Sequence, residues 1–532
     1  MLVRHSLRRL RGAISSVRRT PAKSFSRSAV KEADLEYLSA KSYQAVPKIP
    51  TWKILRSIMD SKQKTMLHKV IKSHHDVMGP IFKFSVPGLP DRVFIDDPEL
   101  LRVLLSKEGK NPVEPGFDPL VYYRSEIRKD LYHQTAGLVG SHGEAWHEVR
   151  KVVQQDMMRS KSATFYIDDV EEISQQFVDL LTAHTDSEGE VEDLNKHVYC
   201  WALESIAAIF LDTRLGNLHK ALHEDSDGQR FIAALRVLLG PDLNDLNLGL
   251  PVWKYIPTPG FIRWDRSMVT IYDITKMYVD IAIEKYKQQE EKEDNELGVL
   301  QKMIRRCGPE SQIPLVMAQD AITAGVDTTG TTVNFLLLDL ANNPRQQEEL
   351  FQEIKTVVKD GKITESKLSE MKYLKACLHE SQRLNAAVPV ISRTVPEDIS
   401  LAGYQIPRGT IVSCFIMNLM VDPKNFANPL QFTPERWLRG CPQHRAHPFA
   451  ALPFGHGPRM CVGRRSVCQY AAYHNSLHVP SLLRFADLEC YVLAIKVLQT
   501  YKLEYHHHLV GLQTCFVNKP DRKIRMKLIR RP

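Results

Sequence analysis

The sequence predicts a mainly α-helical fold with a small β region. The stretch 191–287 is largely helical in pattern, and 314–341 is long enough for one helix of about 28 residues. Strand-like runs are short and few, and the clearest are 81–86 and 92–95. Neither an internal repeat nor a low-complexity linker divides the chain after residue 31, so we expect one large domain over 32–532.

The elements can be placed in order from local signals. A turn at 87–90 joins the two predicted strands, and Asp97 followed by Pro98 predicts the start of a helix. The helical stretch is interrupted near 240–251 and again near 257–260. Within the first interruption, the apolar run that ends at Trp253 is consistent with a mobile lid that touches lipid, and equally with ordinary packing.

The basic charge of the chain is concentrated at its N-terminus. The net charge is +9, yet residues 1–31 hold nine Lys and Arg and no acid, and the other 62 basic and 62 acidic residues cancel. The excess is therefore no sign of nucleic-acid binding. An Arg- and Ser-rich, acid-free segment is typical of a mitochondrial transit peptide, which we place at 1–31, with a disordered basic tail as the alternative. No N-terminal run approaches the roughly 20 apolar residues of a spanning helix.

Neither the cysteines nor the run of three histidines gives a strong indication of a metal site or of a disulfide framework. The nine cysteines include no CxxC pair and no short regular spacing, which argues against a zinc ribbon or a disulfide scaffold. The run His506-His507-His508 would place successive side chains on opposite faces of a strand, so we interpret it as a solvated strand end.

Residues 453–465 are the most constrained stretch of the sequence. Three glycines and two prolines surround Cys461, and they predict a tight loop because glycine permits positive φ and proline stiffens the backbone. Arg459 lies two residues before the cysteine. A thiolate beside a guanidinium suits a soft metal that carries anionic substituents, and cysteine thiolate is one of the few protein ligands of haem iron.

This loop resembles the haem-binding signature of the cytochrome P450 family, which it matches at Phe454, Gly457, Arg459, Cys461 and Gly463. The resemblance implies the cytochrome P450 fold around a buried haem b, with Cys461 as the axial ligand of the iron and Arg459 at a propionate. It also implies a monooxygenase that hydroxylates an apolar substrate, either steroid-like or xenobiotic, with O2.

Further haem contacts are implied by the same resemblance. Trp146 and Arg150 lie four residues apart, so on a helix they share one face. In the family, a tryptophan and an arginine at this spacing donate to the haem propionates, and we assign that role to Trp146 and Arg150. Arg393 fits the family position of another propionate donor.

The middle of the predicted helix 314–341 is unusual for a buried helix, because it contains Gly325, Asp327, Thr328 and Thr329. A threonine can bond the carbonyl four residues earlier and bend the helix, so we expect a local distortion here. The run matches the oxygen-activation motif of the family. The resemblance implies that Thr328 hydrogen-bonds the activated oxygen and that Asp327 supplies protons.

Three charged residues have a structural role in the family. Glu380 and Arg383 lie three apart on one helix face, and Arg436 follows in a Pro-Glu-Arg segment. In the family this glutamate and these two arginines form a buried triad that locks the loop carrying the cysteine.

The redox partner is also suggested by resemblance. Mitochondrial members carry basic residues that dock an acidic adrenodoxin-type 2Fe–2S ferredoxin, and Lys375, Arg464 and Arg465 match them, while a second lysine of the family is His379 here. We therefore expect electrons from NADPH through ferredoxin reductase and ferredoxin, and a peripheral position on the matrix side of the mitochondrial inner membrane. Several stretches resemble arthropod mitochondrial members.

One stretch departs from the family. The helix behind the haem usually follows the cysteine loop directly, but here the matching residues 485–489 arrive only after 466–484, an atypical insertion that contains Pro480. The insertion keeps open a haem-binding but catalytically impaired splice form or a sensor. A haem-thiolate isomerase is a further alternative, against which the Asp327–Thr328 pair argues.

Overall fold

A computed structural model describes residues 32–532 apart from 54, 55, 57–59, 61–64, 86–89, 158–162, 220–224, 241, 244, 245, 247–250, 289–291, 360, 442–445 and 464–484. The predicted transit peptide, the predicted insertion, and Arg464 and Arg465 thus lie outside the described residues.

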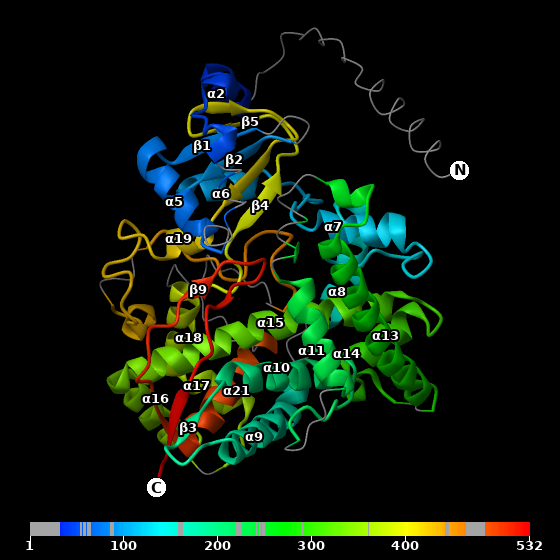
Figure 1. The fold of residues 1–532 in the computed structure, drawn as a ribbon, viewed down its shortest axis with the longest axis vertical. Coiled ribbons are helices and arrows are strands. Elements are labelled where there is room, and N and C mark those ends of the chain that lie inside the picture. The colour runs from blue at the N-terminus through cyan, green and yellow to red at the C-terminus, as the bar shows by residue number, and fades with distance from the viewer. Residues whose placement is uncertain are drawn as a thin grey trace.

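Helices dominate the described part of the chain (Figure 1). The α-helices are α2 (Glu32–Ser39), α5 (Leu67–Met78), α6 (Pro98–Ser106), α7 (Asp118–Tyr122), α8 (Gly143–Met157), α9 (Ile167–Ala183), α10 (Leu194–Phe210), α11 (Asp227–Leu238), α13 (Pro259–Lys287), α14 (Val299–Cys307), α15 (Ile313–Asn342), α16 (Pro344–Val357), α17 (Glu365–Glu370), α18 (Lys372–Leu384), α19 (Ile416–Met420) and α21 (Phe485–Thr500). The short helical turns are η1 (Tyr43–Ala45), η2 (Tyr123–Ile127, a π-helix), η3 (Thr164–Tyr166), η4 (Val252–Lys254), η5 (Asp294–Glu296) and η6 (Pro434–Trp437).

The strands form small sheets, the largest of which has the order β1-β2-β7-β4. The strands are β1 (Ile81–Phe84), β2 (Arg92–Ile95), β3 (Glu190–Val191), β4 (Ile391–Thr394), β5 (Ile399–Leu401), β6 (Tyr404–Ile406), β7 (Ile411–Cys414), β8 (Tyr501–Glu504), β9 (Leu512–Gln513), β10 (Lys519–Pro520) and β11 (Met526–Arg530). The predicted hairpin is present as antiparallel β1 and β2, while β2 pairs in parallel with β7 from far along the chain.

The longest buried helix is α15, which crosses the middle of the molecule (Figure 1). It packs against α10, α13, α18 and α21, so its apolar residues meet neighbours on most sides. The prediction of a helix over 314–341 is confirmed, and the observed helix has 30 residues. The stretch 191–287 contains one break that the sequence pattern did not reveal, because α10 ends at Phe210 and α11 begins at Asp227.

The helix predicted from Asp97 and Pro98 begins as expected. The side chain of Asp97 accepts hydrogen bonds from the backbone N–H groups of Glu99 and Leu100, at 2.8 and 3.1 Å, and Pro98 is the first residue of α6. These bonds satisfy donors that have no partner within the helix. The small sheet and α6 lie together at one end of the molecule (Figure 1).

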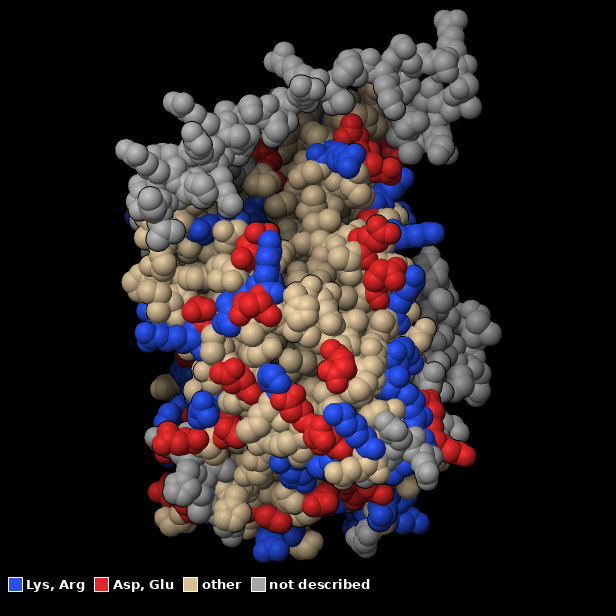
Figure 2. Space-filling view, turned by 90° about the vertical axis from the view of Figure 1, so that its right-hand side faces the viewer, with Lys and Arg blue, Asp and Glu red and all other residues tan. Residues whose placement is uncertain are grey.

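Acidic and basic side chains are interspersed on the face shown in Figure 2, with an uncharged strip in its upper part. This fits the equal numbers of acidic and basic residues after residue 31. Among the described helices, none is both long and apolar enough to cross a membrane.

Candidate active site

The loop around Cys461 has the tight turns that its glycines predict. Gly455 and Gly457 have φ of +72° and +80°, a region that side chains with a Cβ rarely adopt. A Cβ on Gly457 would also lie 1.8 Å from Oε1 of Glu108, so a larger residue there would displace this buried carboxylate. The loop closes on itself where the N–H of Cys461 donates to the carbonyl of Phe454 at 3.0 Å.

Cys461 lies at the wall of a cavity of about 460 Å³. Thr328 and Arg459 line the same cavity, whose surface is mostly apolar and includes Leu243, Trp264 and Met268. Concave apolar cavities of this size with a few polar groups are the usual form of a small-molecule site. The structure thus brings the predicted thiolate and the predicted threonine to one cavity.

The residues of α15 beside the cavity differ in their orientation. The hydroxyl of Thr328 lines the cavity and donates to the carbonyl of Ala324 at 2.8 Å, which is the bond predicted from sequence. Asp327 is fully buried and forms an ion pair with Lys519 at 2.9 Å. Burial raises the pKa of Asp327, although the charge of Lys519 lowers it. Sequence reasoning did not find Lys519, because a lone lysine so far along the chain gives no signal.

The expected helix distortion is not a break in α15, which remains α-helical throughout. Gly325 is instead explained by the packing of α15 against α10. A Cβ on Gly325 would lie 2.9 Å from side-chain atoms of Ile206 in α10, so the glycine allows the two helices to approach closely.

Arg459 stacks on the buried Trp146 of α8, with its guanidinium carbon 4.2 Å from the ring centroid. Its N–H groups donate to three backbone carbonyls, those of Pro112, Leu138 and Ser141. Burial lowers the pKa of Arg459 to about 10. The described contacts include carbonyls and an imidazole nitrogen but no carboxylate.

Arg150 also lies near Trp146, with its guanidinium carbon 5.9 Å from the ring centroid. It is buried, and its described hydrogen bond is a long one of 3.4 Å to Gln154. Burial lowers the pKa of Arg150, and the charge of Cys461 acts in the opposite direction. The prediction that Trp146 and Arg150 share one helix face therefore agrees with the geometry.

Arg393 also lines the cavity, but acidic side chains already surround it. Its guanidinium forms ion pairs with Glu108 and Glu114, the second at 3.0 Å. Burial lowers the pKa of Arg393, but these two carboxylates outweigh burial and the pKa is raised. Neither glutamate was singled out from sequence, since both precede the arginine by hundreds of residues.

These residues fit a haem with two propionates. Arg150 is buried and Arg459 is partly buried, and neither forms a described ion pair with a carboxylate, although the charges of Glu108 and Glu114 act on Arg459. An anion at this place would offset the cost of desolvating the two cations. The thiol of Cys461 would supply the thiolate ligand of the iron. Because Glu108 and Glu114 already match the charge of Arg393, this arginine would contribute less to binding a propionate than Arg150 or Arg459.

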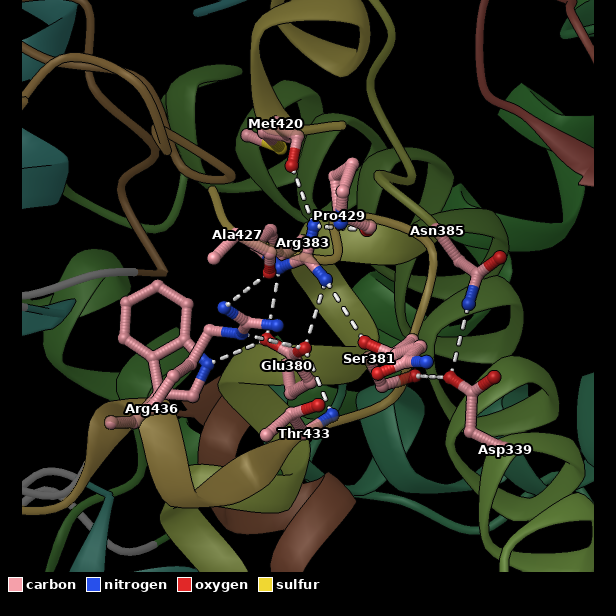
Figure 3. A network of polar contacts seen from close by, with 12 residues as sticks. Asp339, Glu380, Ser381, Arg383, Asn385, Met420, Ala427, Pro429, Thr433 and Arg436 are labelled. Atoms are coloured by element: carbon pink, nitrogen blue, oxygen red, sulfur yellow. Dashed lines mark hydrogen bonds and ion pairs between the residues drawn. The ribbon is translucent and has the colours of Figure 1, made fainter. Parts of the chain in front are cut away.

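The predicted triad forms a closed network of buried charges (Figure 3). Glu380 accepts two hydrogen bonds from Arg383, at 2.8 and 2.9 Å, and one from Arg436 at 2.9 Å. Arg383 also donates to the carbonyls of Met420 and Pro429. The network joins α18 to the segment after α19 and to η6. These two segments precede the cysteine loop in the sequence, so the network fixes the chain that leads into the loop.

Two further members of this network were missed from sequence. Trp437, next to Arg436, donates its indole N–H to Glu380 at 2.9 Å. Asp339 of α15 accepts hydrogen bonds from Ser381 and Asn385, at 2.7 and 3.0 Å (Figure 3). Burial raises the pKa of Asp339 to about 7.

The predicted docking residues are only partly described. Lys375 lies on α18 and donates to the carbonyl of Ser369 at 2.9 Å. His379, at the family's second lysine position, packs edge-on against Trp437 at a centroid distance of 5.7 Å. It therefore faces the triad rather than extending from the surface as a lysine would.

The histidine run shows no metal-like arrangement. His506 contacts Glu504 and His507 contacts Glu190, each at 3.0 Å, beyond the end of β8. In the part of the chain that the structure describes, no three His, Cys, Asp or Glu side chains are grouped as metal ligands would be.

Comparison with known proteins identifies the family. Residues 47–466 match the family described as Cytochrome P450. The chain is 35% identical over 462 residues to "Cytochrome P450 CYP12A2" of Musca domestica, covering 82% of this chain and 85% of the relative. It is 33% identical over 518 residues to "Probable cytochrome P450 301a1, mitochondrial" of Drosophila melanogaster, covering 93% and 88%. The "Probable cytochrome P450 12a5, mitochondrial" of the same fly is 29% identical, covering 93% and 92%.

These matches confirm three predictions made from sequence: the resemblance to arthropod mitochondrial members, the mainly α-helical fold with a small β region, and haem b as the cofactor. The chain belongs to the cytochrome P450 family of haem-thiolate monooxygenases.

Proposed function

We propose that this chain is a mitochondrial monooxygenase that inserts one atom of O2 into an apolar, steroid-like or xenobiotic substrate. Its electrons would come from NADPH through ferredoxin reductase and a 2Fe–2S ferredoxin. The observation that carries the proposal is that Cys461 and Thr328 share one mostly apolar cavity of about 460 Å³. Haem b bound there would supply the activation of oxygen.

Each predicted residue has a proposed role. Cys461 holds the iron, and Glu380, Arg383 and Arg436 fix the surrounding loop. The propionates are held by Trp146, Arg150, Arg393 and Arg459. This assignment is supported by the burial of Trp146, Arg150 and Arg393, and by the fact that neither Arg150 nor Arg459 forms a described ion pair with a carboxylate.

Thr328 and Asp327 would manage protons. The Thr328 hydroxyl is held in the cavity wall by its bond to Ala324, so it is oriented before a substrate arrives. Asp327 has a raised pKa, which lets it carry a proton closer to neutral pH than an exposed aspartate would. Its partner Lys519 is 18% exposed, and this supports a route for protons from solvent to Asp327.

Location and partner follow from several observations. The relatives named mitochondrial and the acid-free segment 1–31 support a transit peptide ahead of one monooxygenase domain over 32–532. Val252, Tyr255 and Ile256 are 46%, 76% and 64% exposed, and such a patch supports peripheral contact with the inner membrane. Lys375, Arg464 and Arg465 would attract an acidic ferredoxin.

The absorption spectrum of the ferrous protein with carbon monoxide tests the central claim, because it reports thiolate ligation. We expect the thiolate band in the purified protein and its loss in Cys461→Ser. If the serine variant kept an unaltered spectrum, Cys461 would not be the ligand.

Oxygen uptake tests the reaction and the partner together. We expect uptake that requires NADPH, ferredoxin reductase and ferredoxin, and a rate that falls as salt rises. Uptake that is unchanged when the ferredoxin is omitted would exclude the proposed electron route.

A second candidate is a haem-binding form with impaired catalysis. The family match ends at residue 466, where the predicted insertion 466–484 begins, and this favours an interrupted helix behind the haem. We expect a variant that lacks 466–484 to bind haem more fully and to turn over faster than the whole chain. Equal haem content and turnover in both proteins would exclude the impaired form.

A further inference from the structure

One wall of the mostly apolar cavity is polar. Gln319, Asp320 and Thr323 line the cavity from the first half of α15. Because Gln319 and Thr323 lie four residues apart, they share one helix face. Arg124 of η2 lines the same part of the cavity and pairs with Asp320. A substrate that fills the cavity would therefore meet this wall at one end.

Gln319 and Thr323 each present to this wall a polar group that has no described partner. Gln319 is 1% exposed, and its Oε1 accepts a hydrogen bond from the hydroxyl of Tyr132 at 3.0 Å. Its Nε2 has no hydrogen-bond partner among the described residues, and neither does Oγ1 of Thr323 one turn further along. A buried donor without a partner costs free energy, and a ligand that supplies an acceptor recovers it.

The charges beside these groups cancel. Arg124 donates to Asp320 at 2.7 Å and to the carbonyl of Ala136 at 2.8 Å. The second oxygen of Asp320 accepts from the N–H of Val139 at 3.1 Å. Burial lowers the pKa of Arg124, but the charge of Asp320 raises it, and the net shift is upward. Arg124 therefore keeps its positive charge, and the ion pair as a whole has no net charge. Nε of Arg124 also has no described partner, but Asp320 already matches the charge of this arginine. A carboxylate ligand would be repelled by Asp320, whereas a neutral oxygen would not.

We infer that Gln319 and Thr323 bind a neutral oxygen, a carbonyl or hydroxyl, at one end of the substrate. This inference rests on the proposed function and narrows its substrate class. Along α15, Thr323 and Gln319 are five and nine residues from Thr328, or about 8 and 14 Å at 1.5 Å per residue. The oxygen would thus lie roughly that far from the attacked carbon, which fits a rigid four-ring ketone or alcohol better than a fatty acid.

The test compares androstanone, a four-ring ketone, with androstane, the hydrocarbon of the same skeleton. Equilibrium dialysis of the holoprotein against the tritiated compounds gives each Kd without using the iron spectrum. We expect the ketone to bind about tenfold more tightly, as one buried hydrogen bond allows. Gln319→Met, which keeps the side-chain length, should reduce this preference to less than about twofold.

Two further variants keep the test decisive. Thr323→Val should lower the preference in part, so a folding defect in one variant does not settle the outcome. Gln382→Met removes the amide of a glutamine that lines the cavity from α18, and it should retain the full preference. The inference is overturned if the unmodified protein binds both compounds equally or if Gln319→Met keeps the preference. Loss of the ferrous carbon monoxide band would instead overturn the proposed function and leave the dialysis result readable.

Discussion

Two groups of buried arginines differ in how their charge is matched. Arg383 and Arg436 share the carboxylate of Glu380 and also donate to backbone carbonyls, although one terminal nitrogen of Arg436 has no described partner. Arg150 and Arg459 both lie near Trp146 and form no described ion pair with a carboxylate, and burial lowers the pKa of both. The charge of the first group is matched within the polypeptide, whereas the proposed function supplies an anion to the second.

The comparison separates arginines that are expected to stabilise the fold from arginines that are proposed to hold a ligand. A buried charge with its counter-charge in place resists removal of either partner. A buried charge without a counter-charge lowers the stability of the ligand-free protein, and this cost is offset only when a ligand of opposite charge binds. Arg393 is intermediate, because Glu108 and Glu114 already match its charge. The following variants separate the two groups.

The largest expected effect comes from Glu380→Gln. It leaves Arg383 and Arg436 buried without a carboxylate, so we expect the free energy of unfolding to fall by about 5 kcal/mol. Urea denaturation of the apoprotein measures it. The control Glu349→Gln weakens an exposed pair with Arg345 and a contact with Tyr373, and it should cost less than about 1 kcal/mol. A loss below about 1 kcal/mol in Glu380→Gln would mean that the triad does not stabilise the fold.

The contribution of Asp339, which hydrogen-bonds to residues beside the triad, should make the stability of the protein depend on pH. Its folded pKa of about 7 lies above the unfolded value of roughly 4, so between these pH values the folded state holds a proton that the unfolded state has lost. Its contribution to stability therefore falls as pH rises toward 7. Relative to the unmodified protein, Asp339→Asn should gain about 3 kcal/mol between pH 5 and pH 8. A constant difference between the two proteins over this range would contradict the raised pKa.

Trp437→Phe removes one donor from the carboxylate and leaves both arginines in place. Because hydrogen bonds to charged groups are stronger than neutral ones, we expect a loss of about 2 kcal/mol in the free energy of unfolding. The haem content of the folded protein should not change. If stability were unaffected, the indole would be a packing group only.

The smallest expected effect on the fold comes from Arg150→Met. We expect the apoprotein to unfold within about 1 kcal/mol of the unmodified chain, because a buried charge without a carboxylate is lost. Haem should dissociate about tenfold faster, which transfer to apomyoglobin measures. The matched variant Arg383→Met should instead lower the stability of the apoprotein, with a loss of about 3 kcal/mol or more in its free energy of unfolding. Equal losses of stability in both variants would remove the distinction.

Local spacing explains which of these features the sequence could predict. The loop of Cys461, the pair Glu380 and Arg383, and the bond from Thr328 each depend on residues within a few positions of one another. Glycine, proline and charge at fixed intervals indicate such features directly.

Features that join distant segments could not be predicted in the same way. Lys519, Glu108 and Glu114 look like surface charges in sequence, and only the fold brings them to Asp327 and Arg393. Gly325 was interpreted as a source of distortion because its contact with Ile206 depends on how α10 packs against α15. The separation of α10 from α11 lies in a stretch without a strong breaking signal.

The ion pair between Lys519 and Asp327 has a consequence for how such an enzyme diversifies. The lysine sits in the short strand pair β9–β10, which belongs to none of the helices that surround α15. Lys519 does not line the cavity, so its substitution can change the acidity of Asp327 and leave the residues of the cavity wall the same. If Asp327 supplies protons as proposed, the rate of the reaction and the choice of substrate can change independently during evolution.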